Sequence, residues 1–247
     1  MRGAYLGPEF NNDSIELYLK KNEYSYQKLL DEELPNKIAD LIADKKVIGW
    51  FQGRMEFGPR ALGSRTIIGD ARSPEMQKTI NLKIKYRESF RPFAPSVRAE
   101  NISDYFEIDR ESPYMLLVAN VKKDKQVEMS KEQNSYFGLE KLNVVRSVVP
   151  AITHVDYSAR IQSVNGKTNP RYHKVLTQFN DKYGCPVIVN TSFNVRGEPI
   201  VCTPKDAYLC FMRTEMDCLV MGNYLLKKTE QKPLSKDSDW RSEFELD

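Results

Sequence analysis

Short apolar runs alternate with amphipathic helical segments along most of this 247-residue chain, and this alternation constrains the fold more than any other feature. A short apolar run predicts a buried strand, whereas apolar residues recurring every three or four positions predict a helix. The predicted strands are 47–51, 66–69, 93–97, 114–121 (as a central strand), 159–164, 186–189, 218–221 and 224–226. The predicted helices are 38–42, 74–84, 172–183 and 204–212. Strands interspersed with helices indicate an α/β or α+β sheet protein.

The pattern predicts one compact domain with a polar extension at each end. We expect residues 1–46 to form a leading arm and a helix, because 11–33 are polar and acidic, and residues 229–247 to form a polar tail. The domain itself spans 47–228, and a chain of 247 residues is long enough to bury roughly 70 to 75% of its unfolded surface. Within it, 122–150 is a variable insert, whose polar, turn-rich part predicts a surface excursion.

Charge is distributed unevenly along the chain. The 37 Lys and Arg residues against 34 Asp and Glu leave a net charge of only +3, which excludes a polybasic nucleic-acid binder. However, residues 54–98 contain ten basic and four acidic side chains, a net of +6, while residues 1–44 carry a net charge of −4. Such segregation indicates an anion site in the basic segment.

Targeting signals and metal-binding patterns are not evident in the sequence. The N-terminus has no signal-peptide pattern, and the longest apolar runs are far shorter than the roughly 20 residues of a membrane helix. The four cysteines do not match a zinc-site spacing, so we expect buried free thiols in a reducing cytoplasm: Cys185, Cys202, Cys210 and Cys218. With two histidines on separate segments, we expect no protein metal cage.

The first candidate site is a cluster of cations. Lys85, Arg87 and Arg91 follow the predicted helix 74–84, and Arg60 and Arg65 lie upstream. Arginine forks match phosphate oxygens and lysine adds a point charge, so this cluster suits a phosphate ligand. The alternative is a solvated basic helix end that complements the helix dipole.

The second candidate site is the loop Asn190–Pro199, directly after the predicted strand 186–189. Ligands of open sheets bind at the carboxyl ends of strands. The short Asn and Ser side chains can donate to phosphate or carbonyl oxygens, and Gly197 permits a tight turn. A turn stabilised by its own side chains explains the same residues, and the sequence leaves both interpretations open.

A third segment contains His154, Asp156 and Arg160. His154 and Asp156 would share one face of an extended strand, but no nucleophile accompanies them, so a hydrogen-bonded structural histidine is the better interpretation. Arg160 is a further candidate cation. No Walker or Gly-x-Gly-x-x-Gly motif is present, and we interpret Cys202 as a packing residue.

Several motifs resemble the C-terminal part of the carbamoyltransferase family that includes nodulation-factor and antibiotic O-carbamoyltransferases. They are AYLGPEF from Ala4, GWFQGRMEFGPRALG from Gly49, KYRESFRPFAPSV from Lys85, THVD from Thr153, NPRYH from Asn169 and CPVIVNTSFNVRGEPIVCTP from Cys185. The resemblance implies a YrdC-like domain with a twisted open mixed sheet and flanking helices. Its Lys-x-Arg element corresponds here to Lys85-Tyr86-Arg87, and its Ser-x-Asn element to Ser192-Phe193-Asn194.

The resemblance also implies a chemistry: ATP and carbamoyl phosphate bind and yield a carbamoyl-adenylate, with release of phosphate and pyrophosphate. By the family pattern, four cations contact carbamoyl phosphate: Lys85, Arg87, Arg91 and Arg160. Four residues hold the nucleotide, with Mg²⁺ carried by its triphosphate: Arg60, Asn190, Ser192 and Asn194. Arg54 and Arg196 are further candidates.

Members of this family also carry an N-terminal actin/sugar-kinase-like domain, which holds iron ligands and the acceptor hydroxyl. The resemblance implies that this domain is the partner of the present chain, that transfer depends on it, and that residues 1–46 pack on it. The chain departs from the family pattern at Ser64, where Asn is usual, and at the insert 122–150. Two alternatives stay open: threonylcarbamoyl-adenylate synthesis for tRNA modification, against which FGPRALG and AYLGPEF argue, and a non-catalytic nucleotide- or RNA-binding remnant.

Overall fold

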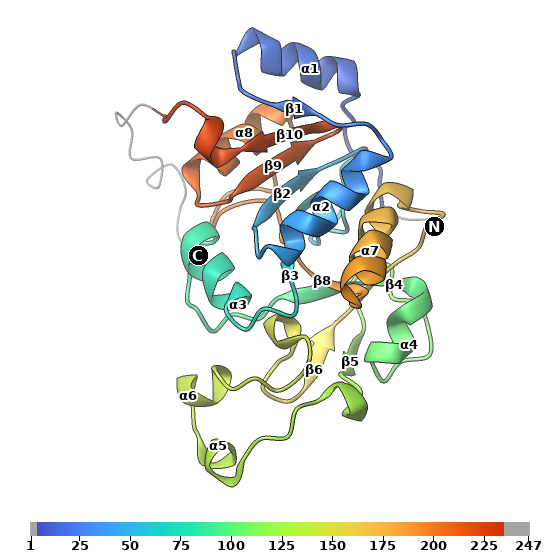
Figure 1. The fold of residues 1–247 in the computed structure, drawn as a ribbon, viewed down its shortest axis with the longest axis vertical. Helices are drawn as coiled ribbons and strands as arrows, with labels where there is room; N and C mark the ends of the chain where they lie inside the picture. The colour runs from blue at the N-terminus through green and yellow to red at the C-terminus, as the bar shows by residue number, and fades with distance from the viewer. Residues whose placement is uncertain (1–3, 235–247) are drawn as a thin grey trace.

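The computed structural model describes residues 4–234 and is built around one mixed sheet (Figure 1). The sheet has eight strands in the order β1-β10-β9-β2-β3-β8-β4-β7. Their bounds are β1 (Gln27–Lys28), β2 (Ile48–Phe51), β3 (Arg65–Asp70), β4 (Ala94–Arg98), β7 (Gln162–Val164), β8 (Val187–Ser192), β9 (Cys218–Met221) and β10 (Tyr224–Lys227). Two of the pairings, β2 with β9 and β4 with β7, are parallel and the others are antiparallel.

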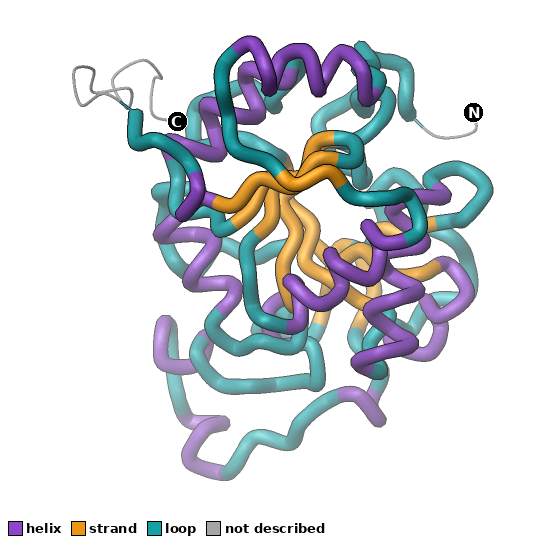
Figure 2. Tube along the Cα trace, turned by 45° about the horizontal axis from the view of Figure 1, so that its top comes forward, coloured by secondary structure: helices purple, strands orange, loops and turns teal. Residues whose placement is uncertain are grey.

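Helices cover this twisted sheet. Figure 1 shows α2 (Glu33–Ala43) and α7 (Pro170–Tyr183) side by side in front of the sheet and α8 (Pro204–Arg213) behind it. Figure 2 shows the strands twisting through the centre of the molecule between helices. The remaining helices are α1 (Asn12–Lys21), α3 (Met76–Thr79), which continues into a π-helical turn (Ile80–Ile84), α4 (Ile102–Tyr105), α5 (Lys131–Ser135) and α6 (Leu139–Leu142).

Local sequence sets where the longer helices begin. Asn169 accepts a hydrogen bond from the backbone N–H of Tyr172, and Pro170 occupies the first turn of α7. Thr203 and Asp206 form a reciprocal capping box at the start of α8. Gly184, with φ of 69°, ends α7 in the left-handed conformation that favours glycine. The chain leaves α7 at Gly184 and enters β8 almost directly.

The N-terminal segment belongs to the fold, so our expectation of a polar arm over residues 11–33 was wrong. Ile15 and Leu19 of α1 are buried in the main core, and β1 pairs with β10 at the sheet edge. The polar residues around them obscured an i, i+4 apolar pair in the sequence. Packing of residues 1–46 on another domain stays a prediction.

The predicted strands 114–121 and 159–164 were also wrong in part. Met115 has φ of 55°, which interrupts an extended run, and only β5 (Val118–Asn120) forms, with two of its three residues exposed. Residues 159–164 divide into β6 (Ser158–Arg160), which pairs with β5 in a separate two-stranded sheet, and β7, which pairs with β4. This division leaves Arg160 at the end of β6.

The other predicted strands and helices are present within one or two residues of their expected positions, apart from the longer α2 and the extension of β8. Residues 122–143 lie at the surface, where α5 and α6 form. None of the helices within residues 4–234 is long and apolar enough to cross a membrane.

Candidate active site

A small cleft lies where β8 ends. It has a volume of about 150 Å³, and its polar lining comes from four segments: the β2–β3 loop, the chain after the π-helical turn, the end of β6 and the end of β8. The lining residues are Pro59, Arg60, Ala61, Arg87, Pro92, Phe93, Ala94, Met115, Arg160, Asn190, Thr191 and Ser192. No acidic side chain belongs to this set, so the cleft favours an anion.

Three arginines meet in the cleft. The Arg87 Nε donates to Asn81 Oδ1 at 2.7 Å, and its guanidinium carbon lies 5.1 Å from the centroid of the Phe93 ring. Burial, and then the nearby Arg91, lower the pKa of Arg87 to about 10, so the side chain stays charged at neutral pH. Burial and the charge of Arg60 lower the pKa of Arg160. Within residues 4–234, no Asp or Glu forms an ion pair with any of these three arginines.

A buried glutamate holds the loop that presents Arg60. Glu56 accepts hydrogen bonds from the backbone N–H groups of Leu62 and Ser64, both at 2.7 Å, and of Arg65 at 3.1 Å. A charged acceptor that closes a loop in this way strengthens each bond. The sequence reasoning missed this role, although an acidic residue within a Gly- and Pro-rich basic loop was a signal for it.

Asn190 connects the cleft to the body of the sheet. Its Nδ2 donates to the Ala61 carbonyl at 2.9 Å and to Gln162 Oε1 at 2.8 Å. The first bond joins β8 to the loop that carries Arg60, and the second joins it to β7. Gln162, like Asn81 beside Arg87, is a supporting residue that the sequence reasoning did not single out.

Lys85 joins the two candidate clusters. Its Nζ contacts the Ser192 carbonyl at 2.5 Å, the Asn194 carbonyl at 2.8 Å and Asn194 Oδ1 at 2.7 Å. Burial lowers the pKa of Lys85 to about 7, while these oxygens favour the protonated ammonium, which only donates. The Lys-x-Arg and Ser-x-Asn elements are therefore in direct contact, with Lys85 holding the loop and Arg87 lining the cleft.

The loop after β8 is further supported by Glu198. Asn194 Nδ2 donates to the Glu198 carbonyl at 2.6 Å, and the Val195 N–H donates to the Glu198 carboxylate at 2.9 Å. Burial raises the pKa of Glu198. The turn is thus stabilised by its own side chains, as one interpretation of the sequence had it, and it also presents Ser192 to the cleft.

Three other predicted cations lie outside the cleft lining. Arg91 pairs with Glu88 at 3.0 Å, and Arg196 lies 3.7 Å from the same carboxylate. Arg65 is buried against backbone carbonyls, among them those of Gln52 at 2.9 Å and Pro8 at 3.2 Å, so its role is structural. Arg65 and Arg91, which the sequence pattern had grouped with Arg60 and Arg87, therefore do not line the cleft with them.

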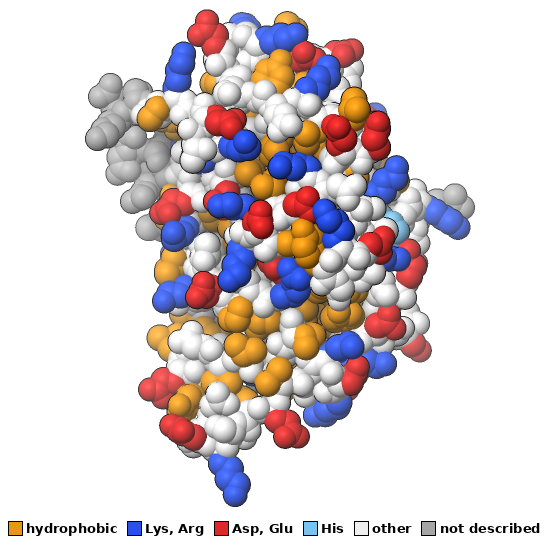
Figure 3. Space-filling view, in the orientation of Figure 1, with side chains coloured by type: hydrophobic (Ala, Val, Ile, Leu, Met, Phe, Trp, Pro, Cys, Tyr) orange, Lys and Arg blue, Asp and Glu red, His pale blue; other side chains and the backbone are white. Residues whose placement is uncertain are grey.

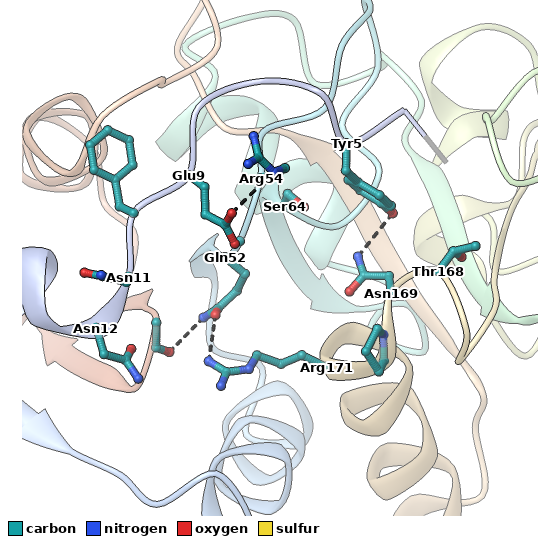
Figure 4. A pocket seen from close by; sticks show the side chains of 14 residues that line it. Tyr5, Glu9, Asn11, Asn12, Gln52, Arg54, Ser64, Thr168, Asn169 and Arg171 are labelled. Carbon is teal, nitrogen blue, oxygen red and sulfur yellow. Dashed lines mark hydrogen bonds and ion pairs between the residues drawn. The ribbon is translucent and has the colours of Figure 1, made fainter. Parts of the chain in front are cut away.

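Arg54 lies in a second, larger pocket of about 560 Å³ (Figure 4). Its Nε lies 3.3 Å from the Glu9 carboxylate, and the opposite side of the pocket holds Arg171, which donates to Gln52 at 3.0 Å. The N-terminal segment forms one wall of this pocket and the start of α7 another.

The remaining candidate groups have structural roles. Asp156 lies in a turn, not in the extended strand that we considered, and accepts from the Ser158 N–H at 3.0 Å and from its hydroxyl at 2.7 Å. All four cysteines are free, but Cys202 is only partly buried, contrary to our expectation. Residues 4–234 contain no group of three His, Cys, Asp or Glu side chains that could hold a metal ion.

Comparison with known proteins identifies the family. Residues 39–228 match the family model described as carbamoyltransferase C-terminus. The chain belongs to this family. It is 60% identical over its whole length to protein sll1178 of Synechocystis sp. and 39% identical over 96% of its length to the nodulation protein NolO of Bradyrhizobium diazoefficiens. It is 33% identical over 75% of its length to the 3′-hydroxymethylcephem-O-carbamoyltransferase of Streptomyces clavuligerus.

The carbamoyltransferase C-terminal region accounts for only part of these relatives. The chain spans 40% of the Synechocystis protein, 40% of NolO and 31% of the Streptomyces enzyme. Among solved structures, Sua5 of P. abyssi in complex with L-threonine has a TM-score of 0.52 at 12% identity, over 80% of this chain and 48% of that one. This likeness concerns the fold alone and confirms the expected YrdC-like mixed sheet with flanking helices.

Proposed function

We propose that this chain binds ATP and carbamoyl phosphate in the arginine cleft and forms a carbamoyl-adenylate for O-carbamoylation of an acceptor hydroxyl. The observation that carries the proposal is the meeting of Arg60, Arg87 and Arg160, without a carboxylate in the cleft lining, beside the Ser192 loop. Arginine forks stabilise the charge that develops on transferring phosphoryl groups. Such a reaction depends on positioning and charge, and it needs no strong protein nucleophile.

The reaction balances with one water molecule. Water converts carbamoyl phosphate to carbamate and phosphate, and a carbamate oxygen then attacks the α-phosphorus of ATP, forming the new anhydride bond and displacing pyrophosphate. In the proposal, Arg87 and Arg160 hold the phosphate of carbamoyl phosphate, and Arg60 and Ser192 hold the nucleotide phosphates. Lys85 and Asn194 act through the loop that they hold, because Lys85 Nζ contacts protein oxygens.

The cleft is large enough for the reacting groups but small for a whole nucleotide, since ligand pockets are commonly about 300–1,000 Å³. Pro92 also lines a neighbouring hollow of about 470 Å³, which is mostly apolar and could receive the nucleoside; its lining includes Phe90, Leu139, Leu142, Ile152 and Val155. Figure 3 shows hydrophobic side chains gathered on the lower part of the face, where α3, α6 and β6 lie in Figure 1. Mg²⁺ would be carried by the triphosphate, because the cleft lining offers no carboxylate.

The test is ATP–pyrophosphate exchange that depends on carbamoyl phosphate, measured with this chain alone and with the remaining portion of a relative added. Exchange with both substrates supports the proposal. A folded chain that gives no exchange in either form, and binds neither substrate in calorimetry, overturns it. The partner domain, its iron and the acceptor hydroxyl belong to the proposed transfer step, which this assay does not require.

The fold shared with Sua5, whose solved structure contains L-threonine, is compatible with one alternative, a threonylcarbamoyl-adenylate synthase. The same exchange assay separates the two, with threonine and bicarbonate replacing carbamoyl phosphate. Exchange only under the second condition would reverse our preference. Steep salt-dependent RNA binding without turnover would instead support a non-catalytic nucleic-acid-binding remnant.

A further inference from the structure

Within residues 4–234, two buried side-chain atoms of the cleft lining have no hydrogen-bond partner: the donor Arg160 Nε and the acceptor Asn190 Oδ1. Asn190 is only 1% exposed, and its Oδ1 is buried without any hydrogen bond. Leaving a buried acceptor unsatisfied is costly, because its hydrogen bond to water is lost without replacement. Since Asn190 lines the cleft, this cost is recovered if a ligand donates a hydrogen bond there.

The orientation of the Asn190 amide is fixed by its neighbours. One of its terminal atoms lies 2.9 Å from the Ala61 carbonyl oxygen, which can only accept, so this atom is the Nδ2 group. Its two hydrogens serve Ala61 and the Gln162 Oε1 at 2.8 Å. The atom without a partner is therefore the carbonyl oxygen, which can only accept.

The orientation of the Gln162 amide is fixed in the same way. Its Nε2 donates to the Leu62 carbonyl at 2.8 Å, so its Oε1 faces Asn190 and also accepts from the Ser96 hydroxyl at 2.6 Å. The Ser96 hydroxyl in turn accepts from the Tyr172 hydroxyl at 3.1 Å. This buried network holds the Asn190 amide in one orientation, with Nδ2 on Ala61 and Gln162 and with Oδ1 left without a partner.

The cleft thus combines cationic donors with one buried acceptor. Phosphate oxygens satisfy the arginines, but they only accept and cannot satisfy Asn190 Oδ1. Carbamoyl phosphate carries both complements, a phosphate and an NH₂ group attached to the same carbonyl carbon. We propose that Asn190 Oδ1 accepts a hydrogen bond from the carbamoyl NH₂ group and selects carbamoyl phosphate over other acyl phosphates. This inference rests on the proposed function and reassigns Asn190 from the nucleotide to the carbamoyl group.

Acetyl phosphate is the matched probe, because a methyl group replaces the NH₂ group at nearly the same size. Sites built to hydrogen-bond a substrate N–H reject an analogue that lacks it by about 10⁴-fold in favourable cases. We expect the native chain to prefer carbamoyl phosphate by at least about 100-fold in kcat/KM for the exchange reaction. Asn190→Leu should abolish most of this preference by lowering kcat/KM for carbamoyl phosphate and leaving that for acetyl phosphate nearly unchanged.

A structural role alone would lower both values equally, so an unchanged ratio in Asn190→Leu overturns the inference. Gln162→Leu is the second variant: it frees the amide to turn, and we expect a partial loss of the same preference. If Asn190→Leu fails to fold, the preference of the native chain for carbamoyl phosphate over acetyl phosphate and its partial loss in Gln162→Leu still test the inference. A change in the preference for ATP over GTP, with the acyl phosphate ratio intact, would assign Asn190 to the base instead and count against the inference.

The native chain separates this inference from the proposed function. If neither acyl phosphate binds or supports exchange, the proposed function fails. If both bind and react equally well, the proposed function stands and the selection by Asn190 is wrong. Calorimetric titration with each acyl phosphate in the absence of ATP gives the same comparison without adenylate formation.

Discussion

The arginine cleft and the larger pocket of Figure 4 both contain arginines, but the two groups differ in their partners. In the larger pocket, Arg171 donates to Asp31 at 2.7 Å and to Asn223 at 2.9 Å, in addition to Gln52. In the cleft, Arg60 and Arg160 face each other's charge, and this proximity contributes to the lowered pKa of Arg160. Within residues 4–234, Arg54 and Arg171 of the larger pocket each pair with a carboxylate, whereas the three arginines of the cleft do not.

The partners of an arginine therefore distinguish a structural role from a ligand-binding role more clearly than the number of positive charges does. Like charges held close together cost stability until an anion arrives. A fold that keeps Arg87 and Arg160 partly buried beside the exposed Arg60 has these side chains preorganised for a ligand. Variants that remove one arginine from each region should therefore change different properties.

Arg160→Met should have the largest effect on activity. Removing a preorganised donor from a site of phosphoryl charge lowers turnover by about 100- to 1,000-fold. The unliganded protein should keep its stability or gain some, because repulsion from Arg60 is relieved. Exchange kinetics and urea denaturation measure the two effects, with Arg171→Met as the matched control. Native-like turnover in Arg160→Met would show that the cleft is not the reaction site.

The two chemical clusters were predictable because their signal is local. Each cluster contains two residues separated by one position: Lys85 and Arg87 in one, and Ser192 and Asn194 in the other. The strand before Asn190 was evident from its apolar run. The resemblance to a family then assigned them a common cleft, and the structure shows Lys85 in contact with both Ser192 and Asn194.

The supporting residues were not predictable, because their partners are distant in sequence. Gln162 reaches Leu62 and Asn190, and the residues that pair with Arg65 come from the N-terminal segment and the β2–β3 loop. A single polar residue within a short strand gives no sequence signal for such contacts. The failure over 114–121 has a similar cause, because the positive φ of Met115 depends on the turn around it.

Arg171→Met should have the opposite signature to Arg160→Met, with a smaller magnitude. The variant leaves Gln52 and Asn223, both largely buried, without their cationic donor, which should cost about 1 kcal/mol of unfolding free energy. Asp31 adds little because its side chain is 71% exposed. We expect turnover of the folded variant to be unchanged. A loss of exchange activity larger than the loss of folded protein would contradict the separation of the two regions.

Sulfate binding should show the smallest effect, through the titration of Lys85. Its pKa in the folded protein is about 7, so the ammonium dominates below this value and the neutral amine above it. Sulfate stays dianionic from pH 7 to pH 9, and Arg87, with a pKa of about 10, stays largely charged. We therefore expect sulfate affinity to fall several-fold over this range as Lys85 loses its charge.

The control variant is Lys85→Met, which isolates the contribution of the lysine. It is needed because burial also raises the pKa values of Glu198 and Cys210, which interact with Lys85. Sulfate should bind this variant more weakly and with little dependence on pH, as measured by calorimetry. A pH dependence that persists in Lys85→Met would assign the titration to another group, such as Glu198, and leave the arginines as the whole of the anion site.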